Sequence, residues 1–104
     1  MDAPVTAKAA ILEALVQGET FGLELIKRVE ERTNGKLRLG QGSVYPALRE
    51  LEREGLVKSW EGDQMPERGG RPRRYYKLTA AGGRALRETR TIVRSLFFPS
   101  METV

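Results

Sequence analysis

The chain has 104 residues, 18 of them Lys or Arg and 14 Asp or Glu, and its formal net charge is +4. Because it contains no Cys and no His, the sequence excludes disulfides, thiolate metal sites and Cys or His catalysis. The length fits one domain, and no apolar run approaches the roughly 20 residues that cross a bilayer. The first residues lack the pattern of a signal peptide, so a soluble cytoplasmic protein with no membrane partner is expected.

Charge is distributed unevenly along the chain. Residues 1–67 hold 9 basic and 12 acidic residues, whereas residues 68–94 hold 9 basic residues and the single acid Glu88. A basic C-terminal third attracts polyanions through its long-range field and through counterion release. The alternative interpretation is a solvated basic face without a ligand.

The first half of the chain predicts two helices and a link. Apolar spacing indicates a helix over residues 5–16, stopped by Gly18. A second helix is expected to start at the cap residue Thr20 and to end at Asn34 and Gly35, which tolerate a left-handed backbone. Its buried stripe is expected to comprise Leu23, Leu25, Ile26 and Val29. Residues 37–39 are expected to form an extended link or an edge strand.

The third predicted helix has the clearest signals. Ser43 is a natural N-cap, Pro46 falls in the first turn, where its missing N–H is not needed, and Gly55 lies at the C-cap. The core-facing positions are Val44, Leu48 and Leu51. The opposite stripe carries Tyr45, Arg49, Glu52 and Arg53. A phenol and two guanidinium groups on one stripe suit a groove of DNA, and a solvated helix face is the alternative.

Residues 56–61 and 71–78 predict two strands, joined by a polar loop too long for a tight hairpin. In the second strand, alternation places positive charge on one side and more apolar residues on the other. The alternating sets are Arg73, Tyr75 and Lys77 against Arg74, Tyr76 and Leu78. Arg74 has an alternative role in a cross-strand ion pair with Glu61. Trp60 is expected to pack between this hairpin and the core, rather than to bind a ligand.

A last helix is expected from the cap Thr79 to about Phe98, where Pro99 stops it. One face is mostly apolar and comprises Leu86, Thr89, Val93, Leu96 and Phe97. The other face carries Arg84, Arg87, Arg90 and Arg94. Because no later element covers the apolar stripe, we expect it to pair with a second copy and give a homodimer. A helix lying on a membrane surface is the weaker alternative.

The order of these elements predicts a winged helix-turn-helix, mainly α with a two-stranded β-wing, followed by a C-terminal dimerisation helix. Residues 1–78 are expected to form the DNA-binding domain, and residues 79–104 the dimerisation helix and tail. Residues 42–57, GSVYPALRELEREGLV, closely resemble the signature of the PadR family of bacterial transcriptional regulators. Three further stretches fit the same family: FGLELI at 21–26, GGRPRRYYKLT at 69–79, and the Ala-Gly pair at 81–82.

The resemblance covers about residues 9–86, and the single short final helix is typical of the small subfamily. It implies a winged-helix DNA-binding domain, a C-terminal helix that pairs two subunits, and repression that a small aromatic molecule often relieves. The final helix lacks the Trp that some ligand-binding members carry.

The residues expected to bind DNA lie on the third helix and the wing: Gln41, Ser43, Tyr45, Pro46, Arg49, Arg53, Arg71, Arg73 and Arg74. Ser43 and Tyr45 are expected to contact phosphate, and Arg49 to read a base. The third helix also carries Glu50, Glu52 and Glu54. Most of the attraction to phosphate is therefore expected from the wing.

Catalysis finds little support in the sequence. The loop of residues 40–42 has two glycines before a helix, as in a dinucleotide-binding loop, but Tyr45 replaces the third glycine. No nucleophile–base pair or metal constellation can be assembled, so we expect neither an enzyme nor a cofactor. The predicted function is sequence-specific binding of double-stranded DNA by a homodimeric repressor at an inverted-repeat operator. The alternative is a winged helix that binds protein or RNA without operator specificity.

Overall fold

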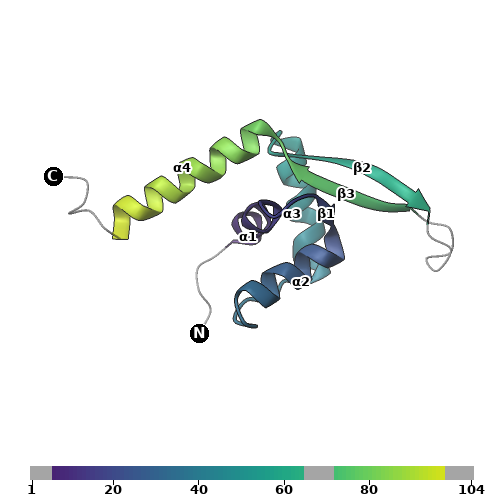
Figure 1. Ribbon diagram of the computed structural model, residues 1–104, viewed down its shortest axis with the longest axis horizontal. Helices are drawn as coiled ribbons and strands as arrows, with labels where there is room; N and C mark the ends of the chain where they lie inside the picture. Colours follow the sequence, from purple (N-terminus) through teal and green to yellow (C-terminus); the bar gives the residue numbers. More distant parts are fainter. Residues whose placement is uncertain (1–5, 65–71, 98–104) are drawn as a thin grey trace.

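The computed structural model describes residues 6–64 and 72–97, with their elements in the predicted winged-helix order. These elements are α1 (Ala7–Leu15), β1 (Thr20–Phe21), α2 (Gly22–Arg32), α3 (Gln41–Arg53), β2 (Val57–Gln64), β3 (Pro72–Leu78) and α4 (Ala80–Phe97). α1, α2 and α3 form a helical body, from which the β2–β3 ribbon and α4 lead away on opposite sides (Figure 1). The fold is therefore mainly helical with a small antiparallel sheet, as predicted.

The core is formed by the inward stripes of the three body helices, with contributions from the sheet and α4. Its largest fully buried side chains are Ile11, Leu25, Val44, Leu48, Leu51 and Val57. The predicted core positions of the third helix are therefore confirmed. Leu23 was predicted to be buried, but it is 44% exposed. At 100° per residue Leu23 lies on the opposite side of α2 from Leu25, which takes the core position.

The sheet contains a strand that the sequence did not reveal. Its order is β1-β3-β2, and Thr20 and Phe21 of β1 pair with Tyr76 and Tyr75 of β3. Thr20 is therefore a buried strand residue, and the prediction that it caps α2 is wrong. The N-cap of α2 is Phe21, whose side chain makes no capping hydrogen bond. Residues 37–39, the predicted link or edge strand, form no strand.

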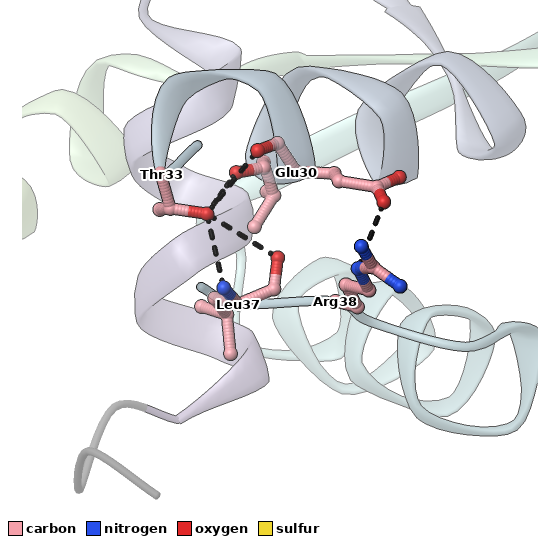
Figure 2. Close-up of polar contacts among 5 residues, drawn as sticks. Glu30, Thr33, Leu37 and Arg38 are labelled. Atoms are coloured by element: carbon pink, nitrogen blue, oxygen red, sulfur yellow. Dashed lines mark hydrogen bonds and ion pairs between the residues drawn. The ribbon is translucent and has the colours of Figure 1, made fainter. Parts of the chain in front are cut away.

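The connection between α2 and α3 is held by side chains of α2 and of its C-cap Thr33. Asn34 and Gly35 have φ values of 52° and 77°, the left-handed conformations predicted for the end of this helix. The Leu37 N–H donates to Oγ1 of Thr33 at 3.0 Å, and Nε of Arg38 lies 3.0 Å from a carboxylate oxygen of Glu30 (Figure 2). These contacts fix the approach of the chain to α3.

α3 begins earlier than the sequence predicted. Its N-cap is Gly40 rather than Ser43, and Pro46 therefore lies inside the helix instead of in its first turn. The missing N–H of Pro46 leaves the carbonyl of Gly42 without its helical partner, and Gly42 is exposed to water. The predicted C-terminal glycine is confirmed, because Gly55 has φ 78°.

The chain leaves α3 through a tight turn. The Leu56 N–H donates to the Leu51 carbonyl at 2.9 Å, and the Gly55 N–H donates to the Glu52 carbonyl at 3.0 Å. This pair of bonds is the Schellman motif, which satisfies the last carbonyls of the helix. It also aims the chain from the end of α3 directly into β2.

α4 is attached to the body at its first half. Thr79 caps it as predicted, because its Oγ1 accepts the Gly82 N–H at 3.0 Å. Leu86 is 5% exposed and belongs to the core. One turn further, Nε of Arg90 donates to a Glu13 oxygen of α1 at 3.0 Å, and this hydrogen bond lowers the pKa of Glu13. The predicted helix end at Phe98 and Pro99 lies outside the described residues.

The second half of α4 exposes apolar side chains. Val93 is 43% exposed, and Leu96 and Phe97 are each 73% exposed. Ile92, which is not part of the predicted apolar face, is 54% exposed on the same half of the helix. Among the described helices, none is long and apolar enough to cross a membrane.

Candidate nucleic-acid interface

α3 presents the predicted polar stripe to solvent. The exposed members of the candidate set on this helix are Gln41, Ser43, Pro46, Arg49 and Arg53. Tyr45 differs, because it is half-buried and packs against the core. A Cβ added at Gly22 would lie 2.6 to 2.7 Å from three atoms of the Tyr45 phenol. Because Gly22 has no side chain, the Tyr45 ring can pack against the first turn of α2, and the two helices can approach closely.

The carboxylates of Glu50 and Glu52 on α3, and that of its C-cap Glu54, are held by partners within the chain. Nζ of Lys8, on α1, lies 2.9 Å from Glu54 and 3.5 Å from Glu50, and these contacts raise the pKa of Lys8. The hydroxyl of Ser59 lies 2.8 Å from both carboxylate oxygens of Glu52. The negative charge of α3 is thus partly balanced by the protein, which reduces its repulsion of a polyanion.

The described wing arginines both make contacts within the fold. The wing is defined here as β2 and β3. The guanidinium of Arg73 lies 4.2 Å from the ring centroid of Phe21, a cation–π arrangement, and its buried Nε has no hydrogen-bond partner in the described residues. Nε of Arg74, whose side chain is exposed, donates to Oγ of Ser59 at 3.0 Å. Glu61 is the strand neighbour of Arg74, but the hydrogen bond of Arg74 goes to Ser59. Arg71 lies outside the described residues.

An aromatic row covers the sheet face that points away from the core. Trp60 stacks on Tyr75 with centroids 6.1 Å apart, and Phe21 meets Tyr75 edge-on at 5.8 Å. Tyr76, the next residue along β3, is 6% exposed and lies in the core. The prediction that Trp60 packs between wing and core is therefore wrong, because Trp60 lies on the outer face. The row was missed because Phe21 joins it through β1, which had no sequence signal.

The predicted dimerisation residues fall into two groups. Leu86 is committed to the core of its own chain, whereas Thr89, Val93, Leu96 and Phe97 are exposed. On the predicted basic face, Arg84, Arg87 and Arg94 are exposed, while Arg90 is paired with Glu13. An uncovered apolar surface thus starts beyond the point where α4 is fastened to α1.

Known proteins share this sequence and this fold. The sequence model of the "Transcriptional regulator PadR-like family" matches residues 11–88. The chain is 34% identical over 86 residues to the transcriptional regulator Rv3488 of Mycobacterium tuberculosis, covering 83% of this chain and 74% of that protein.

Two solved structures extend the comparison. A PadR family transcription regulator from hypervirulent Clostridium difficile matches with a TM-score of 0.71 and 28% identity, over 92% of this chain and 94% of the other. Bacillus subtilis PadR, solved in complex with operator DNA, matches with a TM-score of 0.68 and 26% identity. That match covers 78% of this chain and 43% of the other.

Proposed function

Because the chain belongs to the PadR-like family of transcriptional regulators, we propose that it acts as a homodimeric repressor on an inverted-repeat operator, in the cytoplasm. Members of this family regulate transcription and are not enzymes. The observation that carries the proposal is the exposed stripe of α3, whose arginines face solvent while its acids are held by Lys8 and Ser59. The operator complex of the Bacillus subtilis relative supports it.

In this proposal α3 lies in the major groove and the wing follows the DNA backbone. The α3 contacts come from Gln41, Ser43, Tyr45, Pro46, Arg49 and Arg53, and the wing contacts from Arg71, Arg73 and Arg74. Arg49 lies in the middle of the exposed stripe and reads a base, because a guanidinium bonds a guanine edge with two hydrogen bonds. Ser43 and Tyr45 bind phosphate and set the register.

The Arg49→Ala variant is expected to lose about 1–3 kcal/mol of operator affinity, or roughly 10- to 100-fold, and to accept several bases at one position. The measurement is fluorescence anisotropy on an operator selected from a random duplex library and on its single-base variants. Arg87→Ala, an exposed arginine of α4, is the charge-matched control. Equal loss on every sequence would instead make Arg49 a phosphate ligand.

The wing arginines are expected to act without reading sequence. Changing Arg73 and Arg74 together to Ala should weaken specific and non-specific binding alike. It should also reduce the magnitude of the negative slope of log K against log salt by about 0.9 for each phosphate contact removed. Arg84→Ala combined with Arg87→Ala removes the same charge from α4 and is the control. A folded wing variant with the wild-type slope would show that these two side chains do not contact DNA.

We assign residues 1–78 to DNA binding, and residues 79–104 to pairing of two subunits. A two-fold dimer presents two α3 helices to one side of the duplex, so the half-sites should lie about one helical turn, ~34 Å, or a multiple of it apart. A small aromatic effector that relieves repression belongs to the same proposal and would be detected as loss of operator binding on its addition. Equal affinity for RNA and for unrelated duplexes would favour the alternative module.

A further inference from the structure

Three polar side chains from α3, β2 and β3 meet around one hydroxyl. Ser59 lies 2.8 Å from both carboxylate oxygens of Glu52, and it accepts the Nε–H of Arg74 at 3.0 Å. A hydroxyl has one proton to donate and lone pairs that accept, so that of Ser59 can donate to the Glu52 carboxylate and accept from the Arg74 guanidinium at the same time. Ser59 is thereby the centre of a link between the exposed stripe of α3 and both strands of the wing.

The link lies where the wing leaves the helical body. Ser59 pairs with Tyr76, which is buried. Two residues further from the helical body along β3, Arg74 is exposed. On β2, Val57 is buried and Glu61 is exposed. The core therefore stops covering this face of the strands at the level of Ser59. Further out, Phe21 supports β3 on the other face through its contacts with Tyr75 and Arg73, whereas on this face the described contact is the Ser59 link.

A small change at this point produces a larger displacement further out. From Ser59 to Gln64, at about 3.3 Å per residue, β2 extends ~16 Å. A tilt of ~10° at Ser59 moves the end of that segment by ~3 Å, which is enough to break a hydrogen bond to a phosphate. At the other end of the link, Glu52 lies beside Arg53 and one helical turn after Arg49. The link therefore holds the wing in a fixed position relative to the residues of the exposed stripe.

We propose that Ser59 is a positioning residue, whose hydroxyl fixes the direction of the wing relative to α3 so that both elements meet one DNA duplex. The inference rests on the proposed DNA-binding function, and Ser59 itself contacts no DNA in it. The link uses the Nε of Arg74, so the terminal guanidinium nitrogens are the atoms proposed to contact a phosphate. Arg74 then contributes to DNA binding both through its charge and through the wing direction that it helps to hold.

The test uses three variants of the full chain. Ser59→Ala removes the hydroxyl, whereas Ser59→Thr keeps it on a residue type that strands favour. Ser95→Ala is the matched control, because Oγ of Ser95 bonds the Thr91 carbonyl within α4. Circular dichroism establishes that each variant is folded.

The direction of the wing can be measured without DNA. The chain has no Cys, so Lys27→Cys with Glu61→Cys introduces two exposed spin-label sites, one on α2 and one on the wing. Electron–electron double resonance, with excess unlabelled protein to suppress distances between subunits, reports the separation. We expect one narrow distribution in the wild type, Ser59→Thr and Ser95→Ala. In Ser59→Ala we expect a broadened or ~1 Å shifted distribution, because Glu61 lies about 6.6 Å beyond Ser59 along β2. An unchanged distribution in Ser59→Ala would overturn the proposal.

Operator affinity is then measured on the same proteins. Ser59→Ala should bind about 2- to 30-fold more weakly than the wild type, and Ser59→Thr should restore most of the loss. A shifted distance with unchanged affinity would also overturn the positioning role. If the wild type binds no duplex, the proposed function fails, and the spin-label distances still decide whether Ser59 holds the wing.

Discussion

Replacing Gly82 by Ala is expected to destabilise the fold by about 3 kcal/mol, the upper end of the usual cost of overpacking. A Cβ at this position would lie 2.0 Å from the carbonyl oxygen of Leu56, which is a backbone atom in the turn after α3. That oxygen also accepts the Thr79 N–H at 3.1 Å, so the turn cannot retreat without losing a hydrogen bond. In a domain of this size, a melting temperature more than about 10 °C below wild type should be seen by thermal denaturation.

The neighbouring residue provides the control. Gly83→Ala places its Cβ 3.6 Å from the end of the Arg87 side chain, an ordinary contact. Since Ala favours a helix over Gly by about 0.5–1 kcal/mol, this variant should melt at a higher temperature than the wild type. If the two alanine variants melted alike, the close approach of α4 to Leu56 would not be what requires a glycine.

Changing Leu96 and Phe97 together to Lys is expected to convert the proposed dimer into monomers. Both side chains are 73% exposed, so their loss leaves the fold intact. Each fully buried apolar side chain contributes about 1.5–3 kcal/mol, so the dissociation constant of the dimer should rise by roughly 10²- to 10⁴-fold. Sedimentation velocity measures the dissociation. Affinity for a two-site operator should fall with it, because the half-sites are no longer bound by one molecule.

Lysine is the informative replacement here, because the added positive charge favours DNA electrostatically, and lost binding cannot then come from repulsion. Leu23→Lys, on an exposed position of α2, is the control for oligomeric state. A truncation after Arg84 would be less informative, because it also removes Leu86 from the core and Arg90 from its pair with Glu13. A double Lys variant that sediments as a dimer would contradict the proposed interface.

Local patterns in the sequence were sufficient to predict the helices and the exposed stripe of α3. The core positions Val44, Leu48 and Leu51 follow from helical periodicity, and Gly55 from the chemistry of a helix end. Ser43 was misread as the N-cap because a Pro three residues later usually marks a first turn. The helix starts instead at Gln41, and its N-cap is Gly40, which has an extended backbone.

Features that depend on partners distant in the sequence could not be predicted from local patterns. β1 has two residues and exists because β3 pairs with it, so it produces no alternation of its own. Lys8 lies 46 positions from Glu54, and neither residue signals the other. Trp60 was expected to pack between the wing and the core, as a lone aromatic in a strand usually does, but the register with Tyr75 places it on the outer face.

The pairing of Thr20 with Tyr76 has a consequence for the order in which the chain folds. The helices α1, α2 and α3 are adjacent in sequence, whereas this pairing closes a loop of more than 50 residues, and long loops close late because of their entropy. During synthesis, β1 has to wait for β3, and the bond between Arg90 and Glu13 forms later still. The helix proposed to join two subunits is thus seated after the helical body has assembled. Subunit pairing would then select chains whose DNA-binding part is already complete.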